Sequence, residues 1–106
     1  MAKEGPREEM KGKIYVAGRR FDKELGRVVG KDISVYQLGA IEQMQKNNGK
    51  VSIQGRGMAT SRAIDVAAIL ERKGIAKIKN VIIKSGSFDA EGRDKFVSEI
   101  EILMEA

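Results

Sequence analysis

The stretch at residues 53–65 reads IQGRGMATSRAID, and it joins the end of a predicted strand to the start of a predicted helix. The apolar strand pattern ends at Ile53, two glycines bracket an arginine, and a helical pattern begins near Thr60 or Ser61. Because glycine adopts backbone conformations that other residues avoid, a strand can turn sharply into a helix here. The stretch therefore fixes the middle of the fold as strand, tight turn and helix.

The same turn has the chemistry of an anion site. Its glycines let the backbone approach a phosphate closely, and the first turn of the helix offers unpaired N–H groups at a positive dipole end. Arg56 and Arg62 add forked cationic donors that match phosphate oxygens. A second interpretation stays open, in which Gly55 and Gly57 only form the turn and Arg62 is a solvated helix residue, because a short G-x-G pattern is weak by itself.

Two helices are predicted from apolar residues at helical spacing. In the first, a stripe recurs every three positions at Val35, Leu38, Ile41 and Met44, and Tyr36 lies off it, where we expect exposure or a subunit contact. In the second, the apolar face runs through Ile64, Ala67 and Ala68, broadened by Ile69 and Leu70.

Strand patterns complete the order β-α-β-α-β-β with an N-terminal extension. The alternation at 50–54 predicts a strand with one buried face, and the β-branched run at 81–83 predicts a central strand. A polar, glycine-containing segment then predicts a long hairpin before the closing strand at 96–104, whose Ile100, Ile102 and Met104 share one side. Two further strands, at 13–18 and 27–30, are predicted upstream without a ranking between them. The first helix is predicted from 32 to 46 with Asp32 or Ser34 as N-cap, and the second from 60 to 73.

Composition excludes most catalytic chemistry. The 106 residues include no cysteine and no histidine, which removes disulfides, thiolate metal sites, imidazole bases and serine–histidine triads. We therefore expect a protein that is not an enzyme and holds no metal or cofactor. No apolar run approaches a membrane span and no secretory leader is recognisable, so we expect a soluble, intracellular protein with no membrane contact.

The charge balance favours an anionic partner. The formal net charge is +5, and most of it falls in residues 1–31, where nine bases and five acids give +4. The first twelve residues contain the only proline and little apolar mass, so we expect residues 1–12 to form a flexible tail.

Several separate pieces resemble the Alba family of small archaeal chromatin and RNA-binding proteins. Arg56-Gly57, Ala59 and the helix opening at 61–65 are similar to the family signature. Upstream, residues 27–32 resemble the first strand and its G-K-K-P turn. Downstream, Gly92-Arg93 and residues 97–102 resemble the hairpin tip and closing strand.

The resemblance implies an α+β fold, with a four-stranded mixed sheet packed on two helices. It places the domain at 27–106 and leaves 13–26 as an extension with a possible extra strand. It also implies a homodimer, or a heterodimer with a related chain, that binds DNA, RNA or both without strong sequence preference and is associated with the chromosome.

Carried over by position, Lys31 matches the first lysine of the family pair and Arg56 the arginine after the second strand. Asp32 stands where the second lysine belongs, Ile33 replaces the proline, and Met58 occupies an often basic position. These departures remove cations and add an anion, so they predict weaker phosphate binding.

An alternative alignment sets residues 17–20 against the G-K-K turn, with an insertion before the helix. Arg19 and Arg20 then compensate for the missing cations. The hairpin around Arg93 mixes both signs of charge, and Phe88, Phe96 and Tyr15 either stack on bases or pack on protein.

Three hypotheses follow. The first is phosphate-directed nucleic-acid binding by Lys31, Arg56 and Arg62, with Gly57 in the turn and Arg19, Arg20 and Arg93 as accessory contacts. The second is a protein-interaction subunit of a ribonucleoprotein with weakened nucleic-acid binding, suggested by Asp32 and Met58. The third is a small nucleotide-binding domain that uses the Gly55–Gly57 turn.

Overall fold

A computed structural model describes residues 12–90 and 92–106. The flexible tail predicted for residues 1–12 lies outside the described residues except for Gly12, which is buried. The elements in chain order are β1 (Lys13–Val16), β2 (Arg20–Asp22), β3 (Arg27–Val29), α2 (Ile33–Lys46), β4 (Lys50–Arg56), the 3-10 turn η1 (Gly57–Ala59), α3 (Thr60–Arg72), β5 (Lys77–Ala90) and β6 (Arg93–Glu105).

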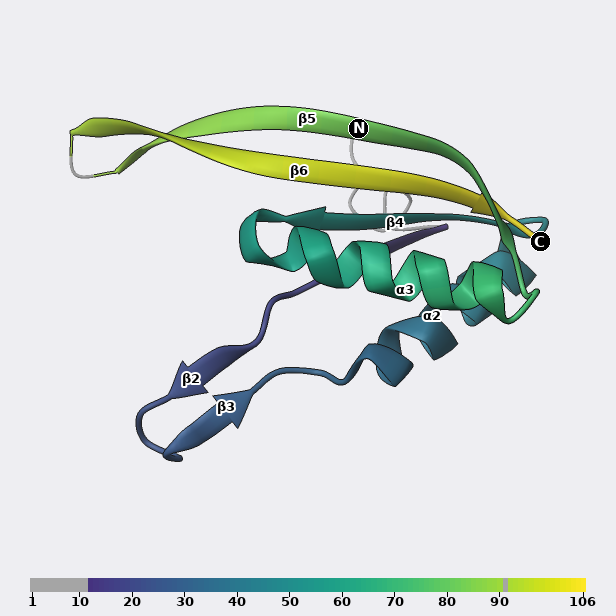
Figure 1. Cartoon of the computed structure of the whole chain (residues 1–106), viewed down its shortest axis with the longest axis horizontal. Helices are drawn as coiled ribbons and strands as arrows, with labels where there is room; N and C mark the ends of the chain where they lie inside the picture. Colours follow the sequence, from purple (N-terminus) through teal and green to yellow (C-terminus); the bar gives the residue numbers. More distant parts are fainter. Residues whose placement is uncertain (1–11, 91) are drawn as a thin grey trace, which may run out of the picture.

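The structure has two layers, as predicted. Four strands form a mixed sheet in the order β1-β4-β6-β5, and only the β1–β4 pair is parallel. Helices α2 and α3 cover one face of this sheet, and the other face carries no helix in the described part of the chain (Figure 1). The α+β class and the two-helix, four-stranded arrangement are confirmed.

The first strand of the sheet is β1, and the placement of residues 27–29 in that role is wrong. Arg27–Val29 pairs only with Arg20–Asp22, in a separate two-stranded hairpin between β1 and α2 (Figure 1). The physical reason is burial: Val16 reaches the core, whereas Val28 is 53% exposed. The topology is that of the alternative alignment, with an insertion before the helix.

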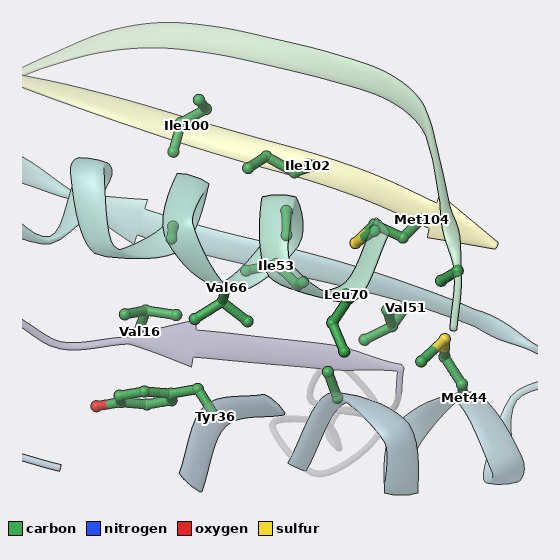
Figure 2. Packing of buried hydrophobic residues seen from close by; sticks show 14 residues of the cluster. Val16, Tyr36, Met44, Val51, Ile53, Val66, Leu70, Ile100, Ile102 and Met104 are labelled. Atoms are coloured by element: carbon green, nitrogen blue, oxygen red, sulfur yellow. The ribbon is translucent and has the colours of Figure 1, made fainter. Parts of the chain in front are cut away.

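The buried face of α2 differs from the predicted stripe. Tyr36, Ala40 and Met44 are buried, whereas Val35 and Leu38 are exposed. Figure 2 shows Tyr36 and Met44 among the core residues. At 3.6 residues per turn, positions four apart rotate less than positions three apart, so 36, 40 and 44 stay closer to one line along the helix. The expectation that Tyr36 is exposed is therefore wrong.

Helix α3 packs on β4 through small side chains. Ala63, Val66, Ala67 and Leu70 are fully buried, while Ile64, predicted on the apolar face, is half exposed. A Cβ at Gly55 would lie 2.5 Å from the carbonyl oxygen of Ala59 and 2.8 Å from the Cβ of Ala63. The missing side chain at Gly55 thus lets the start of α3 approach the end of β4. This is a packing role for Gly55.

The C-terminal hairpin is confirmed, but its first strand is not central. β5 and β6 pair from Lys77–Glu105 to Ala90–Arg93 with one register shift between Ile78 and Asn80, and β5 forms the edge of the sheet. Ile83 is 75% exposed, because a β-branched run favours a strand without specifying its place in the sheet. Ile100, Ile102 and Met104 of β6 do share the buried side, as predicted (Figure 2).

The close contact at Gly55 predicts that alanine destabilises the protein more at Gly55 than at Gly18. Gly55→Ala should lower the free energy of unfolding by about 1–3 kcal/mol, because the added methyl group overpacks the β4–α3 contact. In Gly18→Ala the added Cβ would lie 3.7 Å from the nearest atom, the Cβ of Met58, so this control should stay within about 1 kcal/mol of the parent. Urea unfolding measures both, and equal stabilities of the two variants would contradict the packing role.

Candidate nucleic-acid interface

One edge of the sheet gathers the predicted site residues. Because β1 and β4 are parallel, with Val16 beside Gly55, their carboxyl ends lie at the same edge. The chain leaves that edge from β1 toward the β2–β3 hairpin and from β4 into η1 and α3. We call residues 17–20, 30–32 and 56–62 the basic edge; it contains Arg19, Arg20, Lys31, Arg56 and Arg62, with Asp32 as its single acid.

Both long helices begin at the basic edge. α2 starts directly after Asp32 and α3 directly after η1. Helix N-termini carry unpaired N–H groups and a positive partial charge, which adds to the attraction of the side-chain cations for an anion. The two hairpins, β2–β3 and β5–β6, both project from this side of the molecule (Figure 1). The edge therefore combines backbone donors, cations and extended hairpins.

Arg56 is available to a ligand. Its side chain is 62% exposed, and its Nε lies 3.4 Å from Oε2 of Glu99, the residue opposite it in the β4–β6 register. A surface ion pair of this kind contributes about 0–1 kcal/mol, so it orients the guanidinium without locking it. Sequence reasoning missed Glu99 as the partner, because no local signal links residues 43 positions apart.

The guanidinium of Arg62 contacts other parts of the protein. Its Nη1 donates a hydrogen bond to the carbonyl oxygen of Ala17 at 2.6 Å, and its Nη2 donates one to the carbonyl oxygen of Lys31. Its guanidinium also lies 5.6 Å from the ring centroid of Tyr36, within the range of a cation–π contact. These contacts hold the segment after β1, the segment before α2 and the start of α3 together. Arg62 is thus a positioning residue for Lys31.

The remaining predicted residues are placed as follows. Lys31, Arg19 and Arg20 are exposed on the basic edge, and Lys31 and Arg20 line one shared hollow. Gly57 adopts a φ of +58°, a left-handed conformation that the η1 turn requires and that favours glycine. The side chain of Arg93 lies outside the described part of the chain.

Asp32 is the N-cap residue of α2, but its carboxylate does not cap the helix. It accepts a hydrogen bond from Oγ of Ser34 at 2.9 Å, which holds the pKa of Asp32 below its ordinary value, and Arg19 adds a smaller electrostatic contribution. The carboxylate is therefore ionised throughout the neutral range. It opposes the attraction of Lys31 for phosphate.

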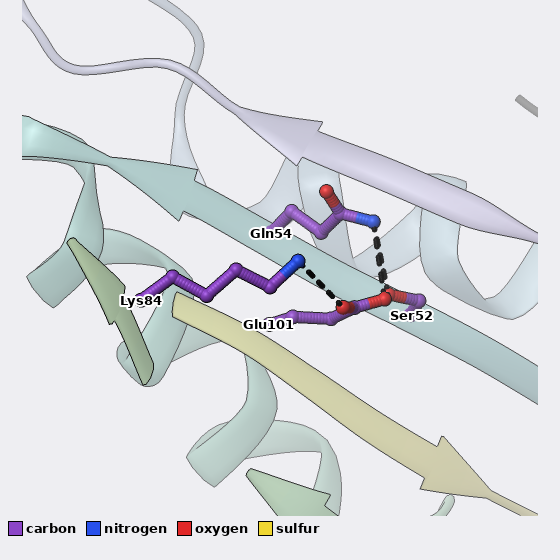
Figure 3. Close-up of polar contacts among 4 residues, drawn as sticks. All are labelled: Ser52, Gln54, Lys84 and Glu101. Atoms are coloured by element: carbon purple, nitrogen blue, oxygen red, sulfur yellow. Dashed lines mark hydrogen bonds and ion pairs between the residues drawn. The ribbon is translucent and has the colours of Figure 1, made fainter. Parts of the chain in front are cut away.

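A polar network lies beside the basic edge, on the face of the sheet away from the helices. Glu101 accepts a hydrogen bond from Oγ of Ser52 at 2.7 Å, and its other oxygen lies 4.0 Å from Nζ of Lys84 (Figure 3). The amide nitrogen of Gln54 donates to Oγ of Ser52 at 3.1 Å. The charge of Glu101 is thus balanced by its own neighbours.

This combination defines a small α+β protein with a cationic edge, and known proteins share its sequence and fold. Residues 27–87 match the family model for Alba. The chain is 34% identical over 79 residues to DNA/RNA-binding protein Alba 1 of Archaeoglobus fulgidus, a match that covers 73% of this chain and 89% of the relative. It is also 34% identical over 71 residues to DNA/RNA-binding protein Alba of Thermoplasma volcanium, covering 65% and 80%.

Solved structures agree. Alba from Thermoplasma volcanium has a TM-score of 0.68 at 28% identity and covers 89% of this chain and 99% of its own. ALBA1 from Trypanosoma brucei, with a TM-score of 0.66 at 14% identity over 90% of this chain and 68% of its own, shows the fold alone. The chain belongs to the Alba family.

The family match and the sheet begin at different residues. The family model starts at residue 27, whereas the first strand of the sheet is β1 at Lys13–Val16.

No helix in the described residues is long and apolar enough to cross a membrane.

The contacts of the two arginines predict that the same substitution destabilises the protein more at Arg62 than at Arg56. Arg62→Met should lower the free energy of unfolding by about 1–2 kcal/mol, because two charge-assisted hydrogen bonds are lost at a partly exposed site. It should also speed amide hydrogen exchange over residues 17–32. Arg56→Met should stay within about 1 kcal/mol of the parent, since it loses only a surface ion pair. Unfolding and exchange measurements that fail to separate the two variants would contradict the positioning role of Arg62.

Proposed function

We propose that this chain is a nucleic-acid-binding protein, not an enzyme, that holds the sugar–phosphate backbone of DNA or RNA at its basic edge largely without sequence preference. The observation that carries the proposal is the meeting of Lys31, Arg56, Arg19 and Arg20 with two helix N-termini at one edge of the sheet. The DNA/RNA-binding names of its relatives support it.

The chemistry of the edge explains why little sequence preference is expected. Arginine and lysine attract phosphate oxygens, and these contacts read neither base nor groove pattern. Each phosphate neutralised releases counterions, which makes the affinity strongly dependent on salt. The negative charge of Asp32 weakens the attraction of this edge for phosphate, and the positive charges of Arg19 and Arg20 offset part of that loss. We propose that the protein organises chromosomal DNA or protects RNA in this way.

We also propose that the chain acts as a homodimer. Four exposed apolar side chains come from α3 and the C-terminal hairpin: Ile64 of α3, Val81 and Ile83 of β5, and Phe96 of β6. In the β5–β6 register, Val81 lies opposite Ile102 and Ile83 lies opposite Ile100. Paired residues point to the same face of the sheet, so Val81 and Ile83 point to the helix side, as the buried Ile102 and Ile100 do. Val81 and Ile83 are nevertheless exposed, because α3 does not cover them. We call these four residues the apolar patch. Exposed patches of this kind mark association sites, and a two-fold pairing would give one particle two basic edges.

The phosphate contacts predict a change in salt dependence. Replacing Lys31 and Arg56 together with alanine should reduce the slope of log K against log salt for duplex DNA by about 1.8, because each lost phosphate contact removes about 0.9. Fluorescence anisotropy with a labelled duplex at several salt concentrations measures the slope.

The matched control removes the same charge elsewhere. Lys46 and Arg72 are exposed near the carboxyl ends of α2 and α3, away from the basic edge, and the Lys46→Ala, Arg72→Ala variant should keep the parental slope. An unchanged slope in the Lys31/Arg56 variant, or an equal loss in the control, would contradict the assignment.

The apolar patch predicts the oligomeric state. Ile83→Lys should convert a dimer into a monomer in sedimentation equilibrium, since it buries an unpaired charge in the proposed interface. Leu38→Lys changes a side chain that is 69% exposed on α2, outside the patch, and should leave the mass unchanged. A parent that sediments as a monomer, or an Ile83→Lys variant that stays dimeric, would rule out this interface.

A further inference from the structure

Tyr15 stands alone as an aromatic side chain on the open face of β1. Its neighbours Ile14 and Val16 turn toward the helices and the core, so strand alternation turns Tyr15 to the opposite face, where it is 48% exposed. It lies beside Gln54 in the β1–β4 register. A half-exposed aromatic ring on a polar sheet face gains little stability from packing within one chain. The exposed part of the Tyr15 ring is therefore available to a ligand.

Tyr15 lines two surface hollows. One hollow, of about 330 Å³, is lined by Tyr15 together with Arg56 and Lys84. The other, of about 500 Å³, is lined by Tyr15 together with Arg20 and Lys31. Tyr15 is therefore common to two hollows that each contain two cations, Arg56 and Lys84 in the first and Arg20 and Lys31 in the second.

The two hollows differ in their acids. Glu99 and Glu101 line the first, where Glu99 pairs with Arg56 and Glu101 is held by Lys84 and Ser52 (Figure 3). The second has no carboxylate among its described lining residues, so its cations are not balanced within the hollow. Asp32 follows Lys31 in the chain but does not line this hollow. Within the hollow a phosphate therefore meets the cations Arg20 and Lys31 without a carboxylate among the described lining residues.

We propose that Tyr15 stacks on an unpaired base while Arg20 and Lys31 hold the adjacent phosphate, which makes this surface a binding site for single-stranded nucleic acid. Stacking on an aromatic ring accepts any base, because every base has a π-face. A duplex keeps its bases stacked on one another inside the helix, so Tyr15 engages only unpaired nucleotides. The inference rests on the proposed function, since Lys31 belongs to both sites.

Two substitutions of Tyr15 distinguish the effect of its aromatic face from the effects of side-chain size and hydrophobicity. Tyr15→Leu removes the aromatic face and Tyr15→Phe keeps it, and both are tested by anisotropy against a 20-nucleotide oligo-dT, a 20-nucleotide oligo-rU and a duplex DNA of about 20 base pairs. Tyr15→Leu should weaken binding of the two single strands about fivefold to hundredfold and leave duplex binding within about twofold. Tyr15→Phe should bind all three probes as the parent does.

Phe21→Leu is the control for an exposed aromatic away from both hollows, since Phe21 is 61% exposed on β2 and lines neither of them. It should leave single-strand binding unchanged. Thermal unfolding of each variant verifies that the fold is retained.

Tyrosine fluorescence gives a second readout. The chain has no tryptophan and two tyrosines, and Tyr36 is buried but also lines the second hollow, so the comparison of the parent with Tyr15→Phe separates a quench of Tyr15 from one of Tyr36. Oligo-dT should quench the emission of the parent and not that of Tyr15→Phe.

The outcomes distinguish this inference from the proposed function. Single-strand binding by Tyr15→Leu equal to that of the parent, with duplex binding intact, would overturn the inference and leave the proposed function standing. Equal losses on duplex and single strands would also overturn it, because Tyr15 would then be a general contact. A parent that binds none of the probes would overturn the proposed function itself. A loss seen with oligo-rU or with oligo-dT alone would support the site and identify its ligand as RNA or DNA.

Discussion

The close approach of α3 to β4 at Gly55 sets the geometry on which the rest of the molecule depends. Because no side chain separates Gly55 from Ala59 and Ala63, the helix begins directly against the end of the strand. That placement brings the guanidinium of Arg62 within reach of the carbonyl oxygens of Ala17 and Lys31. One packing contact therefore leads to a polar one, and together they bring three separate chain segments to a common edge.

Arg62 and Arg56 at this edge differ in what their side chains contact. Arg62 uses its donors within the protein, whereas Arg56 keeps a largely solvated side chain that forms an ion pair with Glu99. The anionic Asp32 lies next to Lys31, and the inserted β2–β3 hairpin adds Arg19 and Arg20 beside them. Since phosphate binding depends on the sum of nearby charges, the hairpin base compensates for an acid that the helix start introduces.

Local patterns in the sequence predicted where the helices and strands lie better than they predicted which elements pair or pack with one another. The ends of both helices, the closing strand and the long hairpin were predictable because caps, glycines and alternation act over a few residues. The choice of β1 over residues 27–29 as the first sheet strand, the edge position of β5 and the buried face of α2 depend on tertiary packing. The same limit applies to the site: Arg56 and Lys31 were predictable as cations, but the Arg56–Glu99 pair and the fork of Arg62 required the register and the fold.

The most direct test of the account is a map of backbone amide chemical shifts on titration with duplex DNA at low salt. Phosphate binding at the basic edge predicts that the largest changes fall on residues 17–20, 30–32 and 56–62, including the amide of Gly57 and the first turns of α2 and α3. Changes confined to the opposite end of the domain, around residues 46–50 and 72–77, would contradict it.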